Sequence, residues 1–195
     1  MLRTHLALGA VGAAMFVAGC ADPLPPADWA RGGGRLDLPQ AMSSYDGDSV
    51  QIRSRGAWAE VLVDGDVELI LDRVGRVYTR RRHPFALLEP DGRLLGREDQ
   101  PLGFVGSANA ALPGRASAWI SLNPNGQVVK YDRSGGQVVG AWTGGCFASP
   151  WAAQACVLVT YLLHLKDATA GDFAADTPMM TPGLSVGVGV GVGIP

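Results

Sequence analysis

The chain has 195 residues, with 27 Gly, 13 Pro, 3 Cys and only 17% charged residues. Its 16 basic and 18 acidic residues give a net charge of −2, which argues against nucleic-acid binding because no basic excess is available to meet phosphates. Three His leave little material for metal or acid–base chemistry. The composition therefore predicts one domain of ordinary size after N-terminal processing, with no cofactor, no metal site and no catalytic centre.

The first twenty residues have the pattern of an export signal. Arg3 and His5 form a short basic start, a twelve-residue apolar run follows at 6–17, and small residues lead to Cys20. The run is too short to span a membrane. Residues 1–19 are therefore predicted to be a secretory signal peptide.

Cys20 makes this prediction more specific. Val17-Ala18-Gly19-Cys20 resembles a bacterial lipobox, in which the Cys thiol is acylated and the chain is cut just before it. The resemblance implies a lipoprotein precursor held in a membrane by acyl chains on Cys20, and the alternative is an ordinary signal peptide with an incidental Cys. In many enteric bacteria an Asp after the lipidated Cys retains the protein at the inner membrane. Ala21 stands there in this chain, which favours the outer membrane.

Residues 20–44 are predicted to be a flexible tether that carries the domain away from the lipid. Pro23, Pro25 and Pro26 favour extended backbone, Gly32–Gly34 favours flexibility, and the segment shows no apolar periodicity.

Residues 45–167 have the pattern of a single β-rich domain. Short β-prone runs alternate with turn signals such as Asp64-Gly65 and Asn125-Gly126, whose residues accept the positive φ of tight hairpins. The spacing predicts a mainly β fold, an antiparallel hairpin array in a barrel or sandwich of about eight to ten short strands. The ten runs are Val50–Arg53, Ala57–Val63, Val67–Leu71, Arg76–Arg80, Phe85–Leu88, Arg93–Gly96, Leu102–Val105, Ala118–Leu122, Gln127–Tyr131 and Gln137–Trp142.

One apolar helix is predicted over residues 150–166. Ser149 supplies an N-cap and Pro150 suits the first helical position. The segment is apolar around most of its circumference, so it must be buried on most sides. Its thirteen-residue apolar stretch is short for a membrane span, which needs about 20 residues, so we expect a helix packed within strands.

This order of elements resembles the tubby-like fold of the LURP-one and scramblase-related proteins, in which a β-barrel of hairpins closes on an apolar C-terminal helix. The likeness rests on turns such as Asp91-Gly92 and on the run Ala155–Leu165, and it covers Tyr45–Lys166 as a pattern only. That fold has twelve strands, two more than the runs counted here. The resemblance implies a membrane-associated module or a binder of anionic lipid, and it assigns no binding residue.

The last segment, residues 168–195, is predicted to be a flexible tail. Val and Gly alternate from Val186 to Gly193, which suits an edge strand in period but is weakened by Gly and by the free chain end.

Charge is distributed unevenly along the chain. Residues 21–72 hold ten acidic residues and four Arg, whereas residues 73–97 hold seven Arg and two acidic residues. Two interpretations stay open: a patch for anionic lipid or another anionic ligand, or basic strands that pair with the acidic ones inside the domain. The patch would consist of Arg76, Arg80, Arg81, Arg82 and His83.

Two further sets of residues are candidate sites. Cys146 and Cys156 are ten residues apart and are expected to form a disulfide outside the cytoplasm, with buried reduced thiols as the alternative. Asp64, Asp66 and Glu68 alternate as in a solvated acidic strand face, or as a weak cation site.

The sequence as a whole predicts a lipid-anchored protein of the bacterial cell envelope that acts as a non-catalytic interaction or scaffold module. Its partners would be the membrane and an envelope protein. The alternative is a module that binds anionic lipid or a small ligand, through the arginine patch or through a cavity beside the helix.

Overall fold

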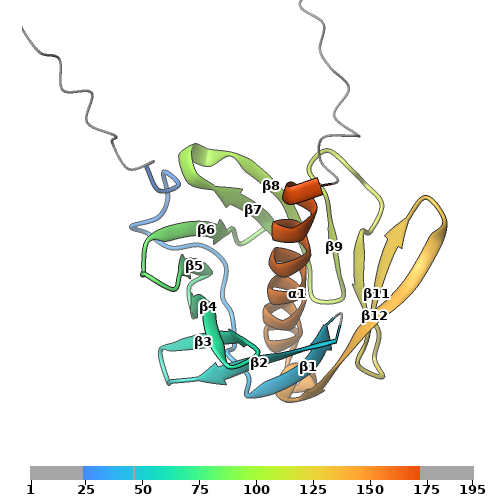
Figure 1. The fold of residues 1–195 in the computed structure, drawn as a ribbon. Coiled ribbons are helices and arrows are strands. Elements are labelled where there is room, and N and C mark those ends of the chain that lie inside the picture. The colour runs from blue at the N-terminus through green and yellow to red at the C-terminus, as the bar shows by residue number, and fades with distance from the viewer. Residues whose placement is uncertain (1–23, 46, 172–195) are drawn as a thin grey trace, which may run out of the picture.

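The computed structural model describes residues 24–45 and 47–171, and Figure 1 shows their arrangement. The predicted signal peptide, the lipobox with Cys20 and the tail from residue 172 onward lie outside the described residues. The elements in chain order are β1 (Ala41–Tyr45), β2 (Asp48–Ser54), β3 (Trp58–Val63), β4 (Asp66–Asp72), β5 (Arg76–Thr79), β6 (Pro84–Leu88), β7 (Arg93–Gly96), η1 (Arg97–Asp99), β8 (Pro101–Val105), β9 (Asn109–Ala111), β10 (Ile120–Leu122), β11 (Gln127–Asp132), β12 (Gly135–Gly144), η2 (Gly145–Phe147) and α1 (Pro150–Gly171).

The twelve strands form one closed antiparallel barrel. Each strand pairs with the next in the chain, and β12 pairs with β1 to close the ring. The prediction of a mainly β hairpin array is therefore confirmed, as a barrel and not a sandwich. Closure leaves the barrel without a free sheet edge along its paired segments.

The turn between β3 and β4 shows how local chemistry sets the register. Val63 pairs with Asp66, so Asp64 and Gly65 are the only loop residues, and both have positive φ, 50° and 91°. This is the backbone of a tight primed turn, whose twist matches that of the strands it joins.

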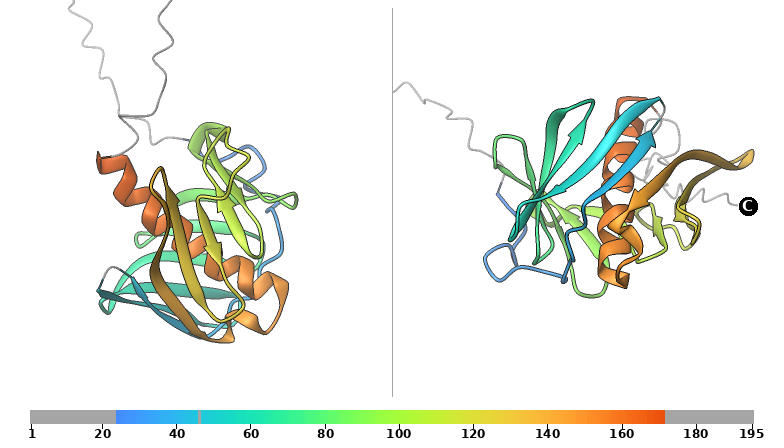
Figure 2. Two further views of the ribbon diagram at one scale, coloured as in Figure 1. Left: turned by 90° about the vertical axis from the view of Figure 1, so that its right-hand side faces the viewer. Right: turned by 90° about the horizontal axis from the view of Figure 1, so that it is seen from below.

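Helix α1 lies inside the barrel, as Figures 1 and 2 show from three directions. All eleven residues from Ala155 to Leu165 are buried, so the helix is covered around its whole circumference. The expectation of a helix packed within strands is thus confirmed. It continues to Gly171, five residues beyond the predicted end, because Ala168 and Ala170 are good helix formers; the tail predicted from residue 168 therefore begins too early.

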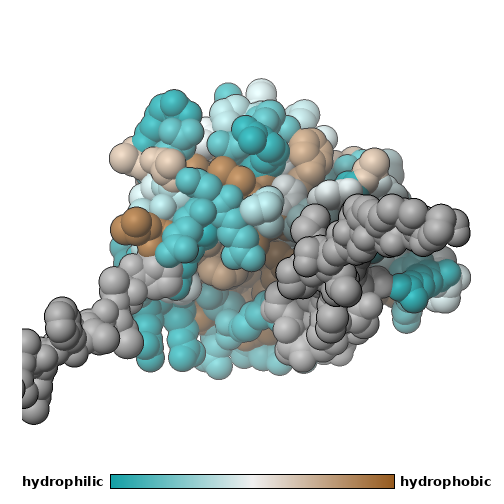
Figure 3. All heavy atoms as spheres, turned by 90° about the horizontal axis from the view of Figure 1, so that it is seen from above, coloured by the Kyte–Doolittle hydropathy of each residue, from teal (hydrophilic) through white to brown (hydrophobic). Residues whose placement is uncertain are grey.

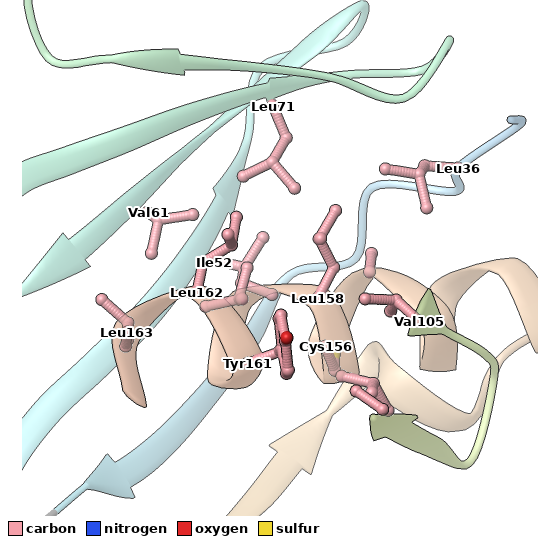
Figure 4. Close-up of a cluster of buried hydrophobic side chains, with 14 of the residues drawn as sticks. Leu36, Ile52, Val61, Leu71, Val105, Cys156, Leu158, Tyr161, Leu162 and Leu163 are labelled. Atoms are coloured by element: carbon pink, nitrogen blue, oxygen red, sulfur yellow. The ribbon is translucent and has the colours of Figure 1, made fainter. Parts of the chain in front are cut away.

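The core is built from aliphatic side chains of the helix and of the surrounding strands. Figure 4 shows Leu158 and Leu162 of α1 beside Ile52 of β2, Val61 of β3 and Leu71 of β4. Each of these five side chains is at most 3% exposed.

Several polar groups of the helix find partners in the barrel wall. Trp142 Nε1 donates to Thr160 Oγ1 (2.9 Å), and Gln154 Nε2 donates to the Val105 carbonyl (2.8 Å). Such pairing matters because a buried polar group without a partner is costly. The disulfide predicted between Cys146 and Cys156 is present and ties η2 to α1.

The tether predicted over residues 20–44 is wrong for residues 24–44, which belong to the domain. The Gly33 amide donates to the Val74 carbonyl (2.7 Å), and the Gly34 amide donates to the Leu88 carbonyl (2.6 Å). Leu36 is 1% exposed, and β1 lies in the same stretch. At Gly33 a Cβ atom would collide with the Leu88 carbonyl, so the glycines serve close packing here and not flexibility.

Two strands were not predicted from the sequence. β1 begins with the weakly β-prone Ala-Met-Ser-Ser, and β9 has only three residues. Both form because the barrel offers partners on each side, β12 and β2 for β1 and β8 and β10 for β9.

None of the helices in residues 24–171 combines the length and the apolar content that a membrane crossing requires. On the face in Figure 3, apolar side chains lie in small groups among hydrophilic ones.

Candidate ligand-binding site

The loop between β5 and β6 forms a basic turn, defined here as Arg80–His83, with all four side chains exposed. The Thr79 amide donates to the His83 carbonyl (3.0 Å), and the Arg82 amide donates to the Thr79 carbonyl (2.8 Å). These bonds close the loop and place Arg82 at a φ of 62°, in the left-handed region. The arginines are therefore presented to solvent on a defined backbone.

Arg76 does not join this exposed group, although the sequence placed it in the same patch. Its Nε donates to the Trp29 carbonyl (2.7 Å) and its Nη2 to the Ala30 carbonyl (2.7 Å). Its Nη1 lies 3.2 Å from Asp72 Oδ2. Arg76 thus fastens the N-terminal segment to β4 and β5, and the patch reduces to the basic turn.

A surface pocket of about 320 Å³ lies beside the basic turn, and it is called the outer pocket below. The β-sheet register assembles it, since Trp58 pairs with Asp72 and Ile70 pairs with Tyr78 across β3, β4 and β5. The residues next to these in sequence, such as Leu71 and Val77, are buried in the core, so the pocket lies on the outer face. The lining residues are Ala57, Trp58, Ile70, Asp72, Tyr78 and Arg82.

Aromatic rings form much of the wall of the outer pocket. Tyr78 is packed edge-to-face against Trp29, with ring centroids 5.0 Å apart, so its ring is supported from behind. The Arg82 guanidinium lies over the Trp58 ring at 5.2 Å from the centroid. This cation–π contact extends the basic turn to the edge of the pocket.

The one acidic residue of the outer pocket is already engaged. Asp72 pairs with Arg76, and the Tyr78 hydroxyl lies 3.4 Å from its Oδ2. Burial first, and then the neighbouring Asp72 carboxylate, raise the pKa of Tyr78, so its hydroxyl stays protonated and donates to that carboxylate. The positive charge at the edge of the pocket is therefore not cancelled by Asp72.

The exposed arginines of the turn differ from several other arginines of the domain. Arg31, Arg55 and Arg93 each form an ion pair with an acidic residue nearby in sequence. Across residues 24–45 and 47–171, no carboxylate pairs with the arginines of the basic turn. Internal charge pairing thus accounts for Arg76, while the turn keeps its charge available.

Two of the three acidic residues that alternate over residues 64–68 take structural roles, and Asp64 lies in the β3–β4 turn and not on a strand. Asp64 Oδ1 accepts from the Ser49 amide (2.9 Å), and Glu68 pairs with Lys166 of α1 at 2.8 Å. Among the residues that the structure describes, no group of three or more His, Cys, Asp or Glu could hold a metal ion.

A small cavity lies beside α1, bordered by Ser43, Trp142, Thr160 and His164. Its volume of about 10 Å³ matches a single water molecule. This cavity therefore has no room for the small organic ligand that was predicted to bind beside the helix. The Tyr161 hydroxyl is already hydrogen-bonded, since it donates to the Leu102 carbonyl (2.5 Å). Burial raises the pKa of Tyr161.

Sequence reasoning found the basic turn but missed Trp58 and Tyr78, which stand twenty residues apart. No local motif joins them, because their proximity depends on the register of three strands. Comparison with protein-family models, with curated proteins and with solved structures found no match for this chain. A functional proposal therefore rests on the residues of this chain.

Proposed function

We propose that this protein is a lipoprotein of the bacterial cell envelope, anchored through Cys20, which acts as a non-catalytic interaction module. The observation that carries this proposal is the buried run Ala155–Leu165, which fills the barrel interior. A filled barrel has no lumen for a substrate, so contacts with other molecules must use the outer surface. The lipobox pattern at residues 17–20 supports the anchor, and Ala21 favours the outer membrane.

The tubby-like resemblance is part of this proposal. Twelve antiparallel strands around an enclosed C-terminal helix support it, since that fold has the same strand number. A role as a membrane-associated module follows from the resemblance and agrees with an anchored domain.

Acyl labelling and membrane fractionation of bacteria that express the full chain test the anchor. We expect labelled wild-type protein in the outer membrane, no label on Cys20→Ala, and a labelled Ala21→Asp protein in the inner membrane where the enteric sorting rule holds. Label on Cys20→Ala would contradict the lipoprotein assignment.

Photo-crosslinking in the same cells tests the interaction role. A photoreactive residue is placed at the exposed positions Arg81 and Val138, with and without Cys20→Ala. A discrete crosslinked species that requires the anchor supports the module, and the absence of any such species from both positions contradicts it.

A second candidate function is binding of anionic lipid headgroups by the basic turn. It is favoured by three consecutive exposed arginines without a described carboxylate partner, because guanidinium groups pair well with phosphate. Co-sedimentation of the Cys20→Ala chain with phosphatidylglycerol vesicles tests it, comparing Arg80→Ala/Arg81→Ala with the control Arg93→Ala, whose arginine is paired with Glu89 and Asp91. Equal binding by the two variants would remove this candidate.

A further inference from the structure

We infer that the outer pocket is a binding site for a small planar anion: a flat, ring-bearing molecule whose phosphate or carboxylate meets Arg82 while its ring lies between Trp58 and Tyr78. The inference rests on anion binding at the basic turn and adds to it a pocket, a class of ligand and a role for two aromatic residues.

The backbone at Arg82 is the first observation. A φ of 62° is ordinary for Gly or Asn in such a hairpin loop and unfavourable for a long side chain. An arginine here does not improve the turn, and it pairs with no described carboxylate. Strain kept at one residue is a reason to seek a role for its side chain, and this side chain reaches the outer pocket.

The aromatic walls are the second observation. Trp58 is fixed on β3 opposite Asp72, and Tyr78 on β5 opposite Ile70, so rigid strands hold both rings. Trp29 supports Tyr78 from behind, and the nearly buried Ile70 provides an apolar lining. Preformed rings favour a flat ligand because little side-chain entropy is lost when the ligand stacks on them.

The charges select an anion over a cation. Among the described residues that line the outer pocket, Asp72 is the only carboxylate, and it interacts with Arg76 and Tyr78. Arg82 lines the pocket, and Arg80, Arg81 and His83 lie on the same turn. A cationic ligand would meet several like charges, whereas an anion gains charge-assisted hydrogen bonds.

The size of the pocket sets the scale of the ligand. About 320 Å³ is at the lower end of the range for small-molecule sites, which is about 300–1,000 Å³. One or two fused rings with a single anionic group fit this volume, so 1-naphthyl phosphate is a suitable probe.

Fluorescence titration of the full Cys20→Ala chain with 1-naphthyl phosphate tests the inference. Inorganic phosphate supplies the charge without the ring, and 1-naphthol supplies the ring without the charge. We expect 1-naphthyl phosphate to bind at least about tenfold more tightly than either one, because charge and stacking each contribute about that factor. Equal binding by inorganic phosphate and 1-naphthyl phosphate would overturn the inference.

Variants separate loss of the site from loss of the fold. Arg82→Gly should weaken 1-naphthyl phosphate binding about tenfold while raising the melting temperature, because Gly relieves the positive φ. Glu98→Gly, at a φ of 56° in η1, is the matched control and should leave binding unchanged. Trp58→Ala should weaken binding by about tenfold, and unchanged binding by a folded Trp58→Ala protein would contradict the site.

The two sources of the phosphate, a soluble ring-bearing molecule or a lipid headgroup, give different results. If the ligand is soluble, 1-naphthyl phosphate binds and phosphatidylglycerol vesicles do not compete with it; if it is a lipid headgroup, the vesicles compete and Trp58→Ala also weakens vesicle binding. Vesicle binding that depends on Arg80 and Arg81 but not on Trp58, with no binding of 1-naphthyl phosphate, would overturn the pocket while leaving the lipid candidate standing.

Discussion

The helix run Ala155–Leu165 and the basic turn Arg80–His83 meet opposite requirements in one small domain. Inside the barrel, every residue of the run is buried, Trp142 donates to Thr160, and Tyr161 donates to the Leu102 carbonyl. On the surface, the turn exposes three arginines without a described carboxylate partner and keeps Arg82 at a positive φ. Packing explains why the first region is apolar and buried. The exposed charges and positive φ of the second region are not explained by stability, which favours a role in binding.

The largest loss of stability is expected from cavity formation inside the barrel. Leu158→Ala removes a fully buried side chain that packs between α1 and the strand wall, and should lower the free energy of unfolding by about 2–5 kcal/mol. Val138→Ala, at a side chain that is 56% exposed, is the matched surface control and should change it by less than about 0.5 kcal/mol. Urea denaturation measures both, and similar losses would mean that the helix is not the core element described here.

Loss of the disulfide is expected to cause the next largest decrease in the free energy of unfolding. It closes a loop between residues separated by ten positions, and its loss should cost about 3 kcal/mol in the chain-entropy description. The double variant Cys146→Ala/Cys156→Ala should melt at lower temperature than the oxidised wild type. Reduction should destabilise the wild type and leave the double variant unchanged; a reductant effect on both proteins would point to another cause.

A smaller loss of stability is expected from a substitution at the start of α1, where the helix meets the N-terminal segment. Ser149 Oγ accepts from the Ala152 amide (3.1 Å) as an N-cap, and its hydroxyl donates to Asp37 Oδ2 (2.6 Å). Ser149→Ala removes both bonds and should cost about 1 kcal/mol at pH 7. Chemical denaturation measures this difference, and Ser107→Ala, at an exposed serine, is the control.

The same pair gives a pH dependence with a definite sign. The hydrogen bond from Ser149 is the main cause that lowers the pKa of Asp37, and the neighbouring Arg35 adds to it. A lowered folded-state pKa stabilises the protein above the unfolded value of about 3.9 and ceases to do so as pH falls through the folded value. The stability gap between wild type and Ser149→Ala should therefore narrow below about pH 4. A gap of constant size down to pH 2 would contradict the role of Asp37.

Local chemistry allowed much of the fold to be predicted. Ten of the twelve strands, the start of the helix at Pro150 and the pairing of Cys146 with Cys156 follow from turn residues, an N-cap and cysteine spacing. These signals act over a few residues, so they can be recognised before the chain is folded.

Tertiary structure decided the remainder. Gly32–Gly34 has the composition of a linker and is packed in place by Val74 of the β4–β5 turn and Leu88 of β6. β1 and β9 exist because a closed barrel supplies their neighbours.

The candidate site shows the same division. The sequence by itself determined that a basic turn is present and that an apolar helix must be enclosed. Only the register of β3, β4 and β5 brings Trp58, Tyr78 and Arg82 around one pocket, and only the folded chain assigns Arg76 to the backbone of residues 29–30. The physical reason is range: turn and helix signals depend on neighbours along the chain, whereas a pocket depends on which distant strands pair and at which residue.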